Sequence, residues 1–157
     1  MKRLFYVGAL ILVGMTAALW PGTERSVSAA TKDKFVGAWR LVSLEEPGAD
    51  GELHQADCTG LLVFTRDGHM SVQVMYKNSQ SGTQAGTVQY AQGGYEASFG
   101  RFGIDESSHR FTFHVEGSLV RSLIGKDLAR VYELSGNQLV VKSANPNEQW
   151  RVVWEHD

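Results

Sequence analysis

Two segments of the sequence place histidine beside small polar or acidic side chains at alternate positions. In "HMSVQVMY" one parity holds His69, Ser71 and Gln73, and the other holds mostly apolar residues. The segment "RFTFHVEGS" repeats the arrangement, with His114 and Glu116 on its polar parity. Histidine transfers protons near neutral pH, and a carboxylate two strand positions away, about 6.6–6.8 Å, can perturb its pKa. These residues could therefore carry out proton transfer on a small organic molecule.

The two parities permit two orientations. In the first, apolar positions such as Met70 and Val74 face the core and the polar row faces water, as in ordinary half-buried strands. In the second, both polar rows line a cavity, where His114 or His69 with Glu116 would act as the proton shuttle. Apolar rows usually face inward, so the first orientation is favoured and the second is the alternative.

The sequence gives little indication of nucleophilic catalysis or of a metal site. No G-x-S-x-G motif is present, and Cys58, the only cysteine, lies in a polar turn without an obvious base beside it. Two imidazoles and a carboxylate, from His69, His114 and Glu116, could ligate a metal, but nothing in their spacing demands one. The sequence therefore predicts no metal and no cofactor.

Strand signals dominate the segments that must position these side chains. The sequence "RDG" separates two of them and predicts a tight hairpin, because Asp-Gly accepts positive φ angles. One short helix is predicted over residues 88–98, where Val88, Ala91 and Tyr95 share a stripe, although two adjacent glycines weaken it by about 1 kcal/mol each. The predicted strands are residues 35–45, 60–65, 69–76, 99–104, 110–118, 128–134, 138–143 and 149–156.

About eight short strands at near-regular spacing are typical of a closed antiparallel barrel or of a sandwich. Short turns join consecutive strands, so neighbours in sequence are expected to pair. The prediction is an all-β, closed antiparallel up-and-down barrel of about eight strands. Its one short helix, between the third and fourth strands, could cap an open end of the barrel.

The first thirty residues have the layout of a secretory signal peptide. A short basic head precedes an uncharged, mostly apolar run, and the small residues of "SVSAA" offer cleavage after Ala29 or Ala30. An uncleaved anchor helix is the alternative, but the run is shorter than the roughly 20 residues that a membrane span prefers. We therefore expect a signal peptide at residues 1–30, one domain at residues 31–157, and export to the periplasm or the medium without a stable membrane span.

The composition restricts the partners of the protein. The chain of 157 residues has a formal net charge of −2, which excludes a broad basic surface for nucleic acid. A single cysteine excludes an intrachain disulfide, so stability must come from the core. The sequence carries no signal for an oligomeric state.

Several motifs together resemble the bacterial and fungal lipocalin-like domain family. They are "FVGAWRLVSLEE", which contains the G-x-W signature of calycins, "GLLVFTRDGHMSVQVM", "FGRFGID", "HVEGSL", "GKDLARVYELSGNQLVV" and the closing "VVWE". The resemblance runs from Phe35 to about Glu155 and implies a calycin-type barrel. It implies no activity, because a fold does not determine function. One departure is "VRSLIG" after "HVEGSL", where such sequences tend to carry a Pro-Asn-Trp-like segment.

The resemblance and the strand pattern add further candidates for a binding site. Arg130 is either a cation in the pocket or a structural residue stacked on Trp39, as a lipocalin arginine packs on the signature tryptophan. Tyr90 and Tyr95 could point from the predicted helix into the cavity mouth. The candidate ligand-binding residues are His69, Ser71, Gln73, Tyr90, Tyr95, Arg101, His114, Glu116, Arg130 and Tyr132.

Three functions remain open from the sequence. The first and favoured one is an exported protein that binds a small hydrophobic or amphipathic ligand in the barrel. The second is a small-molecule isomerase, cyclase or hydrolase, with His114, Glu116 and His69 as candidate catalytic residues. The third is an envelope interaction module whose barrel is fully packed and has no pocket.

Overall fold

The computed structural model describes residues 24–77 and 90–156 and places most of them in one antiparallel sheet. The helices are α1 (Glu24–Phe35) and the short 3₁₀ helix η1 (Arg121–Leu123). The strands are β1 (Gly37–Pro47), β2 (Leu53–Gln55), β3 (Cys58–Phe64), β4 (His69–Tyr76), β5 (Tyr95–Asp105), β6 (Arg110–Ser118), β7 (Asp127–Ser135), β8 (Gln138–Ser143) and β9 (Arg151–His156).

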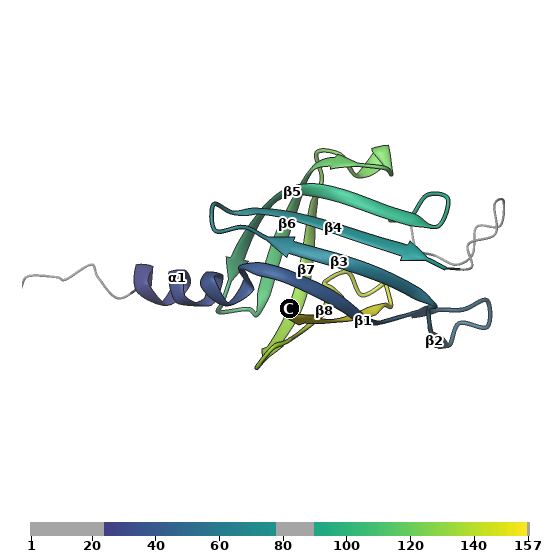
Figure 1. The fold of residues 1–157 in the computed structure, drawn as a ribbon, viewed down its shortest axis with the longest axis horizontal. Helices are drawn as coiled ribbons and strands as arrows, with labels where there is room; N and C mark the ends of the chain where they lie inside the picture. Colours follow the sequence, from purple (N-terminus) through teal and green to yellow (C-terminus); the bar gives the residue numbers. More distant parts are fainter. Residues whose placement is uncertain (1–23, 78–89, 157) are drawn as a thin grey trace, which may run out of the picture.

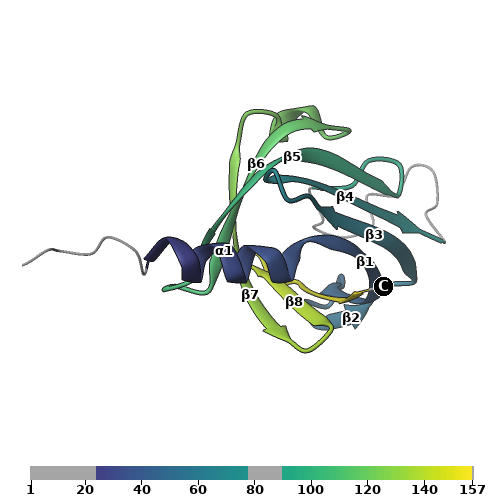
Figure 2. The ribbon, with the colours of Figure 1, turned by 60° about the vertical axis from the view of Figure 1, so that its left-hand side comes forward.

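The sheet closes into a barrel. From β3 to β9 each strand pairs with the next in sequence, and β1 joins β3 at one side and β9 at the other. The short strand β2 pairs only with β1 and lies outside this ring of eight strands. Figures 1 and 2 show the strands wrapping around a common interior. The predicted closed up-and-down barrel of about eight strands is confirmed.

Local sequence explains how consecutive strands pair. Gly68 has a φ of +94° in the turn between β3 and β4, and Phe64 lies opposite Met70 across the hairpin. An L-residue with a side chain rarely adopts this backbone conformation, so the "RDG" turn sets the register of the two strands. Strands β4, β6 and β8 begin and end at the predicted residues.

The helix prediction is wrong over the part of residues 88–98 that the structure describes. Residues 90–94 form turns and an isolated bridge, and Tyr95 begins β5. Gly93 and Gly94 have φ angles of +62° and +76°, which turn the chain into the strand. Pairing with both β4 and β6 satisfies the backbone of β5, and this tertiary pairing overrides the local helical stripe. The long helix of the structure is α1, before the first strand.

Helix α1 leads into β1 at one end of the barrel (Figure 2). Phe35, its last residue, is fully buried and contacts the rings of Phe64, Phe102, Phe111 and Tyr132, which come from β3, β5, β6 and β7. The Trp39 indole nitrogen donates a 2.8 Å hydrogen bond to the Phe35 carbonyl oxygen. An aromatic cluster therefore fills this end of the interior.

The predicted signal peptide lies mostly outside the described residues, which begin at residue 24. Its predicted cleavage positions, Ala29 and Ala30, fall within α1. Of the helices that the structure describes, none is both long enough and apolar enough to cross a membrane.

Candidate functional site

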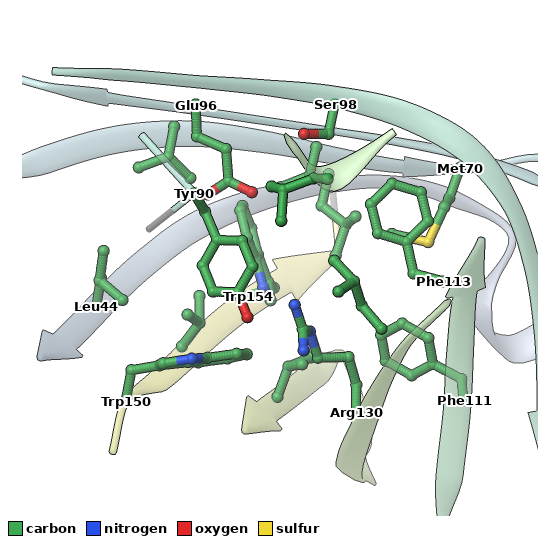
Figure 3. Close-up of a pocket in the computed structure, with 17 residues that line it drawn as sticks. Leu44, Met70, Tyr90, Glu96, Ser98, Phe111, Phe113, Arg130, Trp150 and Trp154 are labelled. Carbon is green, nitrogen blue, oxygen red and sulfur yellow. The ribbon is translucent and has the colours of Figure 1, made fainter. Parts of the chain in front are cut away.

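The barrel interior contains a cavity of about 90 Å³ that is partly open to solvent (Figure 3). Its wall is mainly aliphatic and aromatic, and its polar side chains are few. The lining residues are Leu44, Leu62, Met70, Val72, Val74, Tyr90, Glu96, Ser98, Phe111, Phe113, Leu123, Leu128, Arg130, Val141, Trp150, Val152 and Trp154. The cavity therefore offers an apolar volume with a small number of polar groups that could orient a ligand.

The size of the cavity limits what it can hold. Its volume lies below the roughly 300–1,000 Å³ of typical pockets for drug-sized ligands. An enclosed water needs about 10–15 Å³, so the space corresponds to roughly six to nine water-sized groups. A compact molecule fits this volume, whereas a long chain or a large ring system does not.

Arg130 supplies the positive charge of the cavity. It extends inward from β7, and only 8% of its surface is exposed. The guanidinium carbon lies 5.0 Å from the ring centroid of Tyr90 and 5.0 Å from that of Trp150. Such contacts stabilise a desolvated cation by about 2 kcal/mol or more. The guanidinium also donates a 3.2 Å hydrogen bond to the Ala129 carbonyl oxygen.

Glu148 holds the two aromatic rings beside Arg130 in place. Its carboxylate accepts hydrogen bonds from the Tyr90 hydroxyl (2.7 Å), the Ser143 hydroxyl (2.7 Å) and the Trp150 indole nitrogen (3.4 Å). Burial opposes ionisation of Glu148, but these bonds and one from Asn145 keep the pKa of the carboxyl below its usual value. Glu148 is therefore ionised at neutral pH.

Glu96 and Ser98 bring polar groups into the cavity from β5, and Figure 3 shows Glu96 and Arg130 entering it from opposite walls. Burial raises the pKa of Glu96 to about 7, although the charge of Arg130 works in the other direction. No donor among the described residues forms a hydrogen bond with the Glu96 carboxyl. Ser98 is buried, and its hydroxyl donates to the Ser118 hydroxyl oxygen at 3.0 Å.

The histidine-bearing rows face the outside of the barrel. Met70 and Val74 of β4 are buried, as are Phe111, Phe113 and Val115 of β6. The prediction that the apolar rows face inward is confirmed. The alternative, in which the polar rows line a cavity, is wrong, because strand alternation places the neighbours of buried residues on the opposite face of the sheet. The polar row of β4 consists of His69, Ser71 and Gln73, and that of β6 contains His114 and Glu116.

Each outward-facing charged candidate has a partner on the surface. The His69 and His114 side chains are 41% and 50% exposed and lie 3.1 Å from Asp67 and 2.7 Å from Asp127, respectively. Arg101 and Glu116 form an ion pair with each other at 3.0 Å. The proposed catalytic set of His114, Glu116 and His69 therefore has no access to the cavity.

The remaining candidates divide between the cavity and the core. Tyr90 and Arg130 line the cavity, whereas Tyr132 packs in the aromatic cluster around Phe35. Tyr95 is half-buried and is not among the cavity-lining residues that the structure describes. Of the two alternatives for Arg130, the cation in the pocket is the one observed, and stacking on Trp39 is wrong. The indole instead meets the His156 ring edge-on at 4.7 Å, and Arg130 lies over Tyr90 and Trp150.

Glu96 and Ser98 were not among the predicted site residues, because the helical stripe over residues 88–98 places them in a helix. Extending the strand at residues 99–104 backwards would have found them, because Phe102, Gly100, Ser98 and Glu96 occupy alternate positions. This parity faces inward in β5. The alternation typical of a strand was therefore present in the sequence, but the stripe over residues 88–98 has the period of a helix.

The family of this chain is shown by a match to a family model. Residues 36–156 match the family model described as a lipocalin-like domain. One similar solved structure is an uncharacterized protein from Bacteroides eggerthii DSM 20697, with 15% identity, a TM-score of 0.46, and coverage of 78% of this chain and 99% of that one. A second is a mutant of the fluorescent protein UnaG, with 13% identity, a TM-score of 0.40, and coverage of 79% and 96%. No curated protein matches the chain. Because the family match covers most of its length, this protein belongs to the lipocalin-like domain family.

Proposed function

We propose that this protein is exported and binds a small apolar or amphipathic molecule in its barrel cavity. One observation carries the proposal: an apolar cavity receives a buried guanidinium from β7 and a carboxyl group from β5. Ligand sites in proteins commonly combine an apolar wall with a few converging polar groups. A barrel packed solid would leave no such space, so the interaction module without a pocket is not favoured.

Catalysis by the histidines is not part of the proposal. His114 and His69 lie on the outer face, each beside an aspartate of its own. A general base must reach the proton that it removes, either directly or through one water. A molecule inside the barrel is separated from both imidazoles by the sheet, so binding is the function that the site supports best.

Export is supported by the sequence of the first thirty residues, with its basic head, apolar run and small-residue cleavage motif. Cleavage near Ala29 or Ala30 would leave Phe35, and with it the aromatic closure of the barrel end, in the mature chain. The proposed mature protein therefore keeps every residue of the cavity wall.

Native mass spectrometry of the protein purified from its own host tests ligand binding and export together. We expect a protein mass that corresponds to loss of the first 29 or 30 residues, and a bound molecule of low mass that is released on denaturation. A full-length mass would contradict cleavage. A bound molecule far too large for the cavity would contradict the assignment of the site.

Substitution of Val74 by phenylalanine is expected to block the cavity. Val74 is buried in the cavity wall, so the added ring atoms enter the space that a ligand would occupy. We expect the affinity for hexanol, measured by calorimetry, to fall at least tenfold. Met75→Phe is the matched control, because Met75 is the next residue on the same strand and is 47% exposed. Equal affinities in the two variants would place hexanol outside the cavity.

A further inference from the structure

The charge of Arg130 lacks an anionic partner in the part of the chain that the structure describes. Only 8% of the Arg130 surface is exposed, yet the side chain forms no ion pair with a carboxylate of the described residues. Its guanidinium has five N–H donors, and one donates to the Ala129 carbonyl oxygen. A buried charge without a counter-charge is costly, so the site favours an anion.

The nearby carboxyl groups do not fill this role. The Glu148 carboxylate accepts hydrogen bonds from Tyr90, Ser143 and Trp150, and among the described residues it forms no ion pair with Arg130. Glu96 faces Arg130 across the cavity, but its pKa of about 7 leaves much of it uncharged at neutral pH. The guanidinium therefore keeps the capacity to bind an anion from outside the chain.

We propose that the cavity binds a small monocarboxylic acid, whose carboxylate pairs with Arg130 and whose apolar part contacts the aliphatic and aromatic wall. This inference rests on the binding function proposed above and identifies the class of ligand. The planar guanidinium matches a carboxylate through paired N–H···O bonds. The cavity volume limits the acid to roughly six to nine non-hydrogen atoms if each occupies about the space of one water.

Other head groups fit the site less well. A primary amine would need an ionised Glu96 as its partner, and the positive charge of Arg130 would repel it. A phosphate dianion would face a single cation in the described wall of the cavity, where each further negative charge adds to the cost of desolvation. A neutral alcohol or amide would leave the guanidinium without a counter-charge.

The test compares four ligands of similar length by calorimetry on the wild-type protein at pH 6: hexanoate, hexanamide, hexanol and hexylamine. Hexanamide has nearly the shape of hexanoate but no charge. We expect hexanoate to bind at least tenfold more tightly than hexanamide, in line with the strength of charge-assisted hydrogen bonds. Equal affinities for these two ligands, or tighter binding of hexylamine, would overturn the carboxylate assignment.

Variants of two arginines then test whether Arg130 causes the preference for hexanoate over hexanamide. In Arg130→Met the affinity ratio of hexanoate to hexanamide is expected to fall to near one. In Arg101→Met, which changes an arginine on the outer face of the barrel, the ratio is expected to stay as in the wild type. If Arg130→Met does not fold, Arg130→Lys, which keeps the charge, is expected to retain a preference for hexanoate. A wild-type ratio in Arg130→Met would overturn the inference.

The failure of this inference can be distinguished from the failure of the proposed function. If hexanol and hexanamide bind as tightly as hexanoate and Val74→Phe blocks all three, the cavity binds small molecules but does not select carboxylates. If none of the four ligands binds to the wild-type protein, both the preference for carboxylates and the binding of molecules of this size in the cavity are wrong.

Discussion

Substitution of Phe35 by alanine is expected to lower the free energy of unfolding by about 3–5 kcal/mol, the range measured for large aromatic side chains lost from cores. Phe35 is fully buried, and its ring centroid lies between 4.9 and 6.4 Å from those of four other aromatic rings. Those rings belong to four different strands, which cannot all move inward to fill the space. Urea unfolding of the mature protein, followed by circular dichroism, measures the effect.

Phe99→Ala is the control for this substitution. Phe99 lies on β5 and is 57% exposed, so its loss is expected to cost less than about 1 kcal/mol. Similar losses in the two variants would mean that the Phe35 ring does not contribute to the packing of this end of the barrel. Since neither residue lines the cavity, Phe99→Ala is also expected to leave hexanol affinity unchanged.

The stability of the protein is expected to depend on pH through Glu96. Burial raises the pKa of Glu96 from 4.5 to about 7 in the folded protein, so the folded state holds the proton more tightly than the unfolded state does. The contribution of this group to stability is therefore complete below about pH 4.5 and is lost as the pH rises to about 7. The loss is on the order of 3 kcal/mol, from a shift of about two and a half pH units.

Glu96→Gln isolates this effect, because glutamine is nearly isosteric and does not titrate. We expect wild-type stability, measured relative to the variant by urea unfolding at pH 4.5 to 8, to decline up to about pH 7 and then stay level. Glu133→Gln is the control. Lys142 donates a hydrogen bond to Glu133 and lowers the pKa of its carboxyl, so its contribution changes only at more acidic pH. Parallel wild-type and Glu96→Gln curves would mean that the Glu96 carboxyl is solvated.

Much of the fold follows from local sequence. The alternation of apolar and polar residues in β4 and β6, and the "RDG" turn before β4, predict strands with the observed bounds and a hairpin with the observed register. These features depend on residues that are close together in the chain. The alternation of side chains determines the strands, and the φ angles that each residue allows determine the turn. The same alternation also indicates which row is buried, because the apolar row has the larger free energy of transfer from water.

Other features depend on residues far apart in the chain. The stripe at Val88, Ala91 and Tyr95 has a helical period, yet Tyr95–Asp105 is a strand because β4 and β6 lie on either side of it. A stretch of sequence with two local solutions adopts the one that its neighbours can pair with. This strand pairing also places Glu96 in the cavity.

The sequence by itself determined the barrel class, the strand order, the turn chemistry and the lipocalin-like family. Only the tertiary structure decided which polar groups meet inside. The pair Tyr90 and Glu96, Arg130 and Trp150 come from three segments that are far apart in the chain. Barrel closure brings them to one cavity, while the histidine rows face outward. The physical reason is that periodicity defines the two faces of each strand, whereas the meeting of side chains across the interior depends on the closure and stagger of the whole sheet.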